Sequence, residues 1–197
     1  ESIIKESKSC KLLAANIQIQ SPTKTIGELD YLLEQGKTKT QIHVELSCKF
    51  YLFDPDSFGT FEQKWIGPNK KDSLQDKINK LREKQFPLLF NKNTNNLLKN
   101  IGFNASKATQ QCYLAASLYL PIGQSRLALP KAYQKCVVGY WMHYHQLTLE
   151  DTCSYAVVKK KQWLLPPKAI TQWSSAKEIQ VKILESLENK KAPHVYK

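Results

Sequence analysis

The segment from Ile42 to Leu52 alternates between apolar and polar side chains, and this alternation constrains the fold more than any other feature. Its apolar residues occupy every second position: Ile42, Val44, Leu46, Cys48, Phe50 and Leu52. The polar residues between them are His43, Glu45, Ser47 and Lys49. A period of two is typical of a strand with one buried face. We therefore predict a strand that ends at Asp54-Pro55, because proline cannot continue a central ladder.

A second segment, residues 27–33, alternates in the same way, with Glu28 and Asp30 on its polar side. Residues 34–38 between the two segments are polar and contain a glycine, which suits a turn. A hairpin folded about position 37 or 38 places Asp30 opposite Glu45. The sequence thus predicts an antiparallel hairpin whose polar sides meet.

The polar side of this hairpin would hold Glu28, Asp30, Glu45 and Lys49. Like charges directly opposed across a sheet are destabilising, so this patch indicates a bound cation. Carboxylates on strands are suitable ligands for Mg²⁺, and a nearby lysine can position water or stabilise developing charge. The alternative is a solvated face, because antiparallel sheets often expose one side to water.

The chain of 197 residues has a formal net charge of +12, and much of the excess lies in one stretch. Between Lys64 and Lys107 there are ten basic residues and three acidic ones. Such clustering favours a nucleic-acid partner over a role in solubility alone. The candidate phosphate contacts are Lys70 and Lys71 beside a Gly-Pro loop, and Lys77, Lys80 and Lys84 on a predicted helix. For the three helix lysines, the alternative is the wet face of an amphipathic helix.

Five scattered cysteines without a C-x-x-C pair favour a reducing, cytoplasmic compartment. We expect Cys48 to pack as a small hydrophobe on the apolar side of its strand. No apolar run is long enough for a membrane span, so no membrane partner is expected. The chain begins at Glu1 without a methionine, which leaves open that N-terminal residues are missing.

The remaining elements predict a mixed α/β core that contains the antiparallel hairpin. We expect strands near residues 12–20, 133–145 and 155–165, and a helix over about Asp72 to Gln85. A capping box at Ser175 and Glu178 predicts a last helix that ends near Asn189.

Gly27-Glu28-Leu29-Asp30, followed by a turn and a strand with an acid and a lysine, resembles the PD-(D/E)XK nuclease superfamily. A longer similarity is to an uncharacterised bacterial family, a domain of unknown function placed in that superfamily. It covers roughly the first 90 residues and includes three further segments: residues 12–18, His43-Val44-Glu45-Leu46 running into 49–52, and Trp65-Ile66-Gly67-Pro68-Asn69-Lys70-Lys71-Asp72. The resemblance implies a restriction-endonuclease-like α/β core, in which a mixed central sheet with an antiparallel hairpin is flanked by helices. It implies one nuclease-like domain over 1–197, with a core at about 1–90 and C-terminal strands and a helix at about 130–190.

By the same resemblance, Asp30 would be the metal-binding aspartate, Glu45 the second acid and metal ligand, and Lys49 the catalytic lysine. The superfamily also carries a glutamate on a preceding helix, which would be Glu1 or Glu6. One departure concerns spacing: the superfamily's acid and lysine lie two residues apart, whereas Glu45 and Lys49 lie four apart. Three interpretations stay open: the lysine leans back, Glu28 supplies a carboxylate, or the site has lost its activity.

The expected function is hydrolysis of phosphodiester bonds in DNA with Mg²⁺ or Mn²⁺, with RNA as a further possible substrate. One alternative is a decayed nuclease-fold module that binds nucleic acid through its basic surface without cleaving it. Another is an interaction protein that binds no nucleic acid. The aromatic segment near Trp141 could form the interface of a homodimer.

Overall fold

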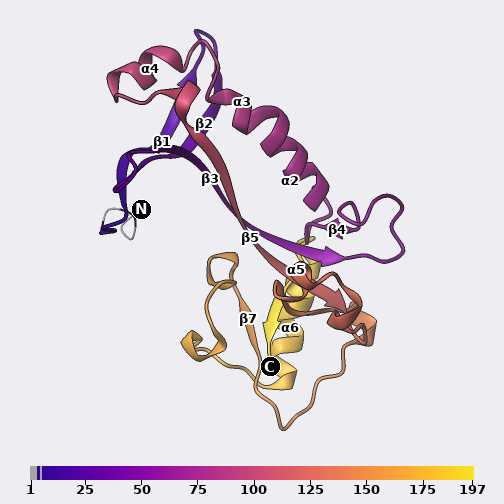
Figure 1. The fold of residues 1–197 in the computed structure, drawn as a ribbon. Coiled ribbons are helices and arrows are strands. Elements are labelled where there is room, and N and C mark those ends of the chain that lie inside the picture. The colour runs from indigo at the N-terminus through magenta and orange to yellow at the C-terminus, as the bar shows by residue number, and fades with distance from the viewer. Residues whose placement is uncertain (1–3, 5) are drawn as a thin grey trace.

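A six-stranded mixed sheet forms the centre of the molecule (Figure 1). The computed structural model describes residue 4 and residues 6–197. The strands follow the order β1-β2-β3-β5-β6, and β4 pairs with β3. Their bounds are β1 (Cys10–Gln20), β2 (Thr25–Gln35), β3 (Gln41–Phe53), β4 (Trp65–Ile66), β5 (Thr109–Pro121) and β6 (Val137–Trp141).

The hairpin of β2 and β3 is antiparallel and has the predicted register. Tyr31 lies opposite Val44, and Glu34 lies opposite Gln41. The paired ladder ends at Tyr31 and Val44, although both strands continue. We call this place, where β2 and β3 separate next to Asp30 and Glu45, the fork.

A helical crossover links β3 to β5, which runs parallel to it. Parallel neighbours require such a crossover because a tight turn cannot join them. The crossover contains α2 (Leu74–Lys80), the π-helix η1 (Leu81–Gln85), α3 (Phe86–Leu88) and α4 (Asn95–Asn100). The predicted fold class is therefore confirmed: a mixed α/β structure whose central mixed sheet, with its antiparallel hairpin, is flanked by helices (Figure 1).

The two faces of β3 are buried in the opposite sense to the one expected. His43 and Glu45 are 0% and 1% exposed, whereas Leu46 is 46% exposed. Cys48 is also exposed, so the prediction that it packs as a buried hydrophobe is wrong. The reason is that α2 and η1 cover the polar face, where Gln85 donates a hydrogen bond to Glu45.

Apolar side chains join the crossover to the sheet. Leu29 and Leu32 of β2 pack with Leu88 and Leu89 of the crossover. A second cluster places Tyr51, Trp65 and Leu118 against Leu74 of α2. Both clusters hold the helices of the crossover over β2 and β3. Residues of the crossover can therefore reach the fork.

The C-terminal part has its own small sheet and helix (Figure 1). Strand β7 (Ala156–Val158) pairs with β8 (His194–Tyr196), and α6 (Ala176–Glu188) begins at the predicted Ser175 capping box. The strands predicted over 133–145 and 155–165 are much shorter than expected, and α5 (Lys131–Gln134) occupies the start of the first. Short 3₁₀ helices span Ala105–Lys107, Arg126–Ala128, Tyr144–Gln146, Lys160–Gln162 and Pro167–Ala169.

The C-terminal part contacts the sheet on the face opposite the crossover. Trp163 packs edge-on against Phe50 of β3, with ring centroids 4.9 Å apart. His194 of β8 contacts Tyr119 of β5 in the same manner. The central sheet extends as far as Trp141, beyond the core expected at about 1–90. Among the described residues, no helix has both the length and the apolar character that a membrane span requires.

Candidate active site at the fork of β2 and β3

The Asp30 side chain holds β2 and β3 together where their backbone pairing stops. The Leu46 amide donates a hydrogen bond of 2.8 Å to Asp30 Oδ2. Beyond the last backbone pair of the hairpin, this hydrogen bond from a side chain to the backbone is what joins the two strands. It fixes the Asp30 carboxylate at the fork, beside β3.

Glu45 is held on both of its carboxylate oxygens. Gln110 Nε2 donates to His43 Nδ1 at 2.9 Å, so a neutral His43 carries its proton on Nε2. His43 Nε2 then donates to Glu45 Oε1 at 2.9 Å. Gln85 Nε2 donates to Glu45 Oε2. A buried carboxylate needs such partners, and they give Glu45 a fixed orientation.

Burial and neighbouring carboxylates act together on Asp30. Burial raises the pKa of Asp30 above its ordinary value, and the charges of Glu45 and Glu28 raise it further. The hydrogen bond from Leu46 and the charge of Lys77 oppose this rise in pKa. The fork is therefore a place where negative charges crowd and where a cation would be favoured.

Lys77 is the lysine that the structure brings toward these carboxylates. It lies on α2, is 9% exposed, and donates from Nζ to Gln85 Oε1 at 2.9 Å. Burial lowers the pKa of Lys77, the charge of Lys80 lowers it further, and the negative charge of Glu45 acts in the opposite sense. Lys77 was predicted as a phosphate contact, with a wet helix face shared with Lys80 and Lys84 as the alternative; its buried side chain does not fit that alternative and turns toward the sheet.

Lys49 was predicted as the catalytic lysine beside Glu45, but the structure pairs it with Asp72. Its Nζ lies 2.7 Å from Asp72 Oδ2, at the start of the crossover. Lys49 shares the polar face of β3 with Glu45 and lies four residues further along the strand. It still acts on the fork at long range, because its charge lowers the pKa of Lys77.

The other predicted site residues are distributed as follows. Glu28 is half-buried on β2 and contributes to the electrostatics of Asp30. Glu1 lies outside the described residues, and Glu6 is exposed near the start of the chain. The predicted nucleic-acid contacts that are exposed are Lys70, Lys71, Lys80 and Lys84.

Sequence reasoning missed four residues of this site: His43, Gln85, Gln110 and Cys112. Cys112 lies beside Glu45 in the parallel register of β3 and β5. Burial raises the pKa of Cys112, and the charges of Glu45 and Asp30 raise it further. The one signal in the sequence was His43, which precedes Glu45 by two residues and therefore shares its face. Gln85 entered the sequence analysis only as the end of the predicted helix.

The donor set at the fork is small. Within the part of the chain that the structure describes, no group of three or more histidine, cysteine, aspartate or glutamate residues is arranged to hold a metal ion. The fork offers two carboxylates on adjacent strands, Asp30 and Glu45, with Glu28 near Asp30. Any metal there would need oxygen ligands from water or from a bound phosphate in addition.

Comparison with known proteins gives one match. A family model described as "Domain of unknown function (DUF1853)" matches residues 1–196. No curated protein and no solved structure matches the chain.

Proposed function

We propose that this chain, which belongs to the DUF1853 family, hydrolyses phosphodiester bonds in DNA with a divalent metal ion at the fork. The proposal rests on one observation above all. Asp30 and Glu45 lie on adjacent strands where the ladder ends, and the buried Lys77 lies beside them. Two acids and a lysine at a fork of a mixed sheet also fit the resemblance to the PD-(D/E)XK superfamily.

The residues at the fork suit Mg²⁺ or Mn²⁺. Mg²⁺ keeps several waters and is usually held by one or two carboxylates together with substrate phosphates. Asp30 and Glu45 supply two carboxylates, and the raised pKa of Asp30 indicates that negative charge there lacks compensation. A metal bound at this place would lower the pKa of its water and offset the charge of the phosphate.

Residues of the chain would bind the metal, orient its ligands and stabilise charge on the phosphate. Asp30 and Glu45 would hold the metal, and His43 and Gln85 would keep Glu45 in position. Lys77 would place a positive charge where negative charge develops on the phosphate. In this proposal Lys77 takes the part that the superfamily resemblance assigned to Lys49.

The partner is proposed to be DNA because the chain carries a formal net charge of +12. The exposed lysines beside α2 and before it would contact the phosphate backbone: Lys70, Lys71, Lys80 and Lys84. A cytoplasmic location suits five cysteines that are all free thiols. A homodimer remains part of the proposal, although Trp141 itself lines a cavity of this chain.

A nicking assay with purified protein tests the proposal. The wild type should cleave plasmid and single-stranded circular DNA only with Mg²⁺ or Mn²⁺ present. Asp30→Asn and Lys77→Met should each lower the cleavage rate by about 10²- to 10³-fold, the typical effect of removing one charge-stabilising group. Lys92→Met, which removes an exposed lysine far along the crossover, is the matched control and should cleave normally. Equal rates for Lys77→Met and Lys92→Met would refute the role of Lys77.

The second candidate is a binding module with a decayed site. The pairing of Lys49 with Asp72 favours it, because the lysine expected beside Glu45 is engaged elsewhere. Such a module would bind DNA with a steep dependence on salt and would show no metal-dependent cleavage. Absence of DNA binding even at low salt would exclude both candidates and favour an interaction protein.

A further inference from the structure

A large groove rich in lysine separates the central sheet from the C-terminal part. It encloses about 940 Å³, and six lysines line it: Lys49, Lys71, Lys159, Lys160, Lys182 and Lys191. Only two carboxylates line it, those of Asp72 and Glu185. Among the described residues, Lys49 is the single groove lysine that forms an ion pair. The groove therefore holds a concentration of positive charge that the protein itself does not neutralise.

The groove includes the part of β3 that follows the fork. Residues 48–50 of β3 line it, and this part of β3 has lost its pairing with β2, because that ladder ends at Val44. Lys49 lies four residues beyond Glu45, or about 13 Å along an extended strand. Glu45 faces the crossover and the groove lies on the other face of the sheet, so an extended chain in the groove would approach the fork around the edge of β3 that β2 leaves unpaired.

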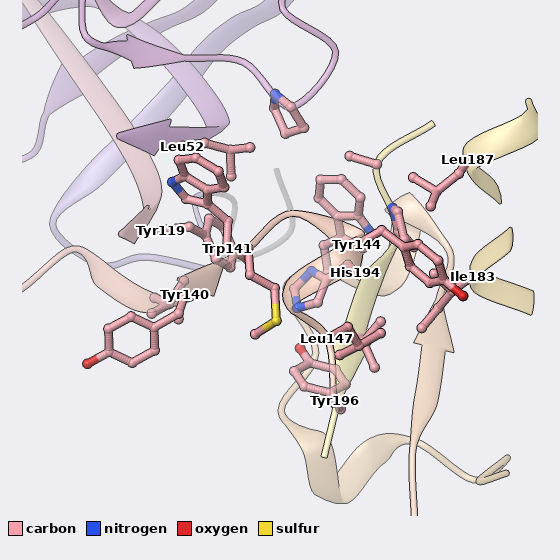
Figure 2. Close-up of a pocket in the computed structure, with 18 residues that line it drawn as sticks. Leu52, Tyr119, Tyr140, Trp141, Tyr144, Leu147, Ile183, Leu187, His194 and Tyr196 are labelled. Carbon is pink, nitrogen blue, oxygen red and sulfur yellow. The ribbon is translucent and has the colours of Figure 1, made fainter. Parts of the chain in front are cut away.

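An aromatic cavity, drawn in Figure 2, adjoins the groove. It encloses about 360 Å³ between β6, α6 and β8. Tyr119 and Trp141 from the sheet and His194 and Tyr196 from β8 lie around it in Figure 2. Burial lowers the pKa of His194, so its ring is neutral at neutral pH and adds no charge to this cavity.

The two hollows share a wall. Trp163 and His194 line both of them, together with Pro68, Ala192 and Pro193. The rings of Trp163 and His194 contact each other with centroids 5.3 Å apart. A ligand bound here would meet lysines on one side of Trp163 and apolar aromatic surface on the other.

From this arrangement we infer that the groove and cavity together bind single-stranded nucleic acid. Proteins that bind single strands combine a positively charged groove for the backbone with aromatic side chains for the bases. The backbone lies along the lysines, and an unpaired base enters the aromatic cavity past Trp163. A base in a duplex is paired and stacked, and its extrusion costs free energy. This inference rests on the proposed function, for which it names the substrate class and the path of the strand.

Fluorescence anisotropy with labelled oligonucleotides of one length tests the inference. All titrations contain EDTA, so they do not depend on hydrolysis. Single-stranded DNA should bind more tightly than the duplex, and an oligonucleotide with abasic positions should bind at least about fivefold more weakly, the loss expected for one stacked base. Equal affinity for single strand and duplex, or no effect of the abasic positions, would overturn the inference. The same titration is done with single-stranded RNA. Tighter binding of DNA or of RNA then shows which of the two is the ligand.

Lysine variants test whether the nucleic acid binds in the groove. Lys159→Gln/Lys160→Gln should reduce the slope of log affinity against log salt by about 1.4, since each phosphate contact of a single strand contributes about 0.7. The control, Lys11→Gln/Lys37→Gln, removes two exposed lysines of the β1–β2–β3 region and should leave the slope unchanged. The same slope for both double variants would overturn the assignment to this groove.

Variants of Trp163 test whether the weaker binding of abasic oligonucleotides arises at the aromatic cavity. In Trp163→Ala the difference between intact and abasic oligonucleotides should disappear, and Trp163→Phe should restore part of it. Circular dichroism checks that both variants fold, because Trp163 Nε1 also donates to the Val158 carbonyl. If wild-type protein cleaves DNA yet binds duplex equally well, this inference fails and the proposed function stands. If it binds single strands in this way without cleaving them, the hydrolytic function fails and the binding site stands.

Discussion

At the scale of single residues, Asp30 has an unfavourable environment that the fold nevertheless preserves. Its carboxylate is partly buried and feels the charges of Glu45 and Glu28, and both conditions raise its pKa. One hydrogen bond from Leu46 and the charge of Lys77 compensate for part of this effect. Residues that a protein keeps at a cost in stability are commonly functional, because activity and stability impose different demands on a site.

The first prediction concerns the stability of Asp30→Asn. Because the folded-state pKa lies above the ordinary value of 3.8, the folded protein binds this proton more tightly than the unfolded chain. Stability therefore falls as pH rises from about 3.8 through the raised pKa, and the loss persists at neutral pH. Asp30→Asn should raise the free energy of unfolding at pH 7 and should give no such gain below pH 3.8, as measured by urea titration.

Metal should reverse this ranking. In the proposed function Mg²⁺ binds at Asp30 of the folded protein, so added Mg²⁺ should raise the wild-type Tm and leave that of Asp30→Asn unchanged. A destabilised Asp30→Asn at pH 7 would show that the Asp30 carboxylate carries no cost in stability. Equal metal stabilisation of both proteins would show that Asp30 is not a metal ligand.

The same residues show what the sequence could predict. The register of β2 and β3 followed from the alternation and from the position of the turn at residues 34–38, both of which are local features. The burial of His43 and Glu45 did not follow, because an alternating pattern indicates two different faces and the usual expectation is that the apolar one is inside. Which face a helix covers depends on the path of the crossover, and this is set by contacts distant in sequence, such as Leu29 with Leu88.

At the scale of elements, the helical crossover presents Lys77 and Gln85 to the sheet. The sequence predicted one helix over about Asp72 to Gln85, whereas the structure has α2 followed by the π-helix η1. A π-helix adds residues to each turn, so positions after it no longer follow the period of 3.6 that defined the apolar stripe. Gln85 is the last residue of this π-helix, so the helical period did not give its direction and its contact with Glu45 could not be foreseen.

The second prediction compares the capping boxes of α2 and α6. Ser73 Oγ accepts a hydrogen bond from the Asp76 amide at 3.1 Å, and Ser175 makes the equivalent contact with Glu178. Ser73→Ala and Ser175→Ala should each lower the free energy of unfolding by about 1 kcal/mol, the usual effect of losing an N-cap. Only Ser73→Ala should also lower the rate of DNA cleavage at saturating substrate, because α2 carries Lys77. Equal cleavage rates in two equally destabilised variants would contradict the positioning role of α2.

At the scale of the whole molecule, β3 connects the fork to the groove, and the groove shares a wall with the aromatic cavity. The N-terminal strands and the crossover supply the fork, and the C-terminal part closes the groove from the other side. The C-terminal part was the least predictable, because β6 pairs with β5 and β7 pairs with β8 across long sequence separations. Propensity in residues 133–145 and 155–165 predicted long strands, but the partners that the fold provides limit pairing to short ones.

The final prediction separates the roles of the fork and the groove by kinetics. An interaction made equally with substrate and transition state affects KM, whereas one made only in the transition state affects kcat. Lys159→Gln/Lys160→Gln should therefore raise KM for single-stranded DNA several-fold with little change in kcat. Asp30→Asn should lower kcat by at least about 10²-fold with little change in KM. Steady-state cleavage with Mg²⁺ across a range of substrate concentrations measures both parameters. A fall in kcat for the lysine variant would mean that the groove acts in the chemical step, and that backbone binding in the groove and hydrolysis at the fork cannot be separated.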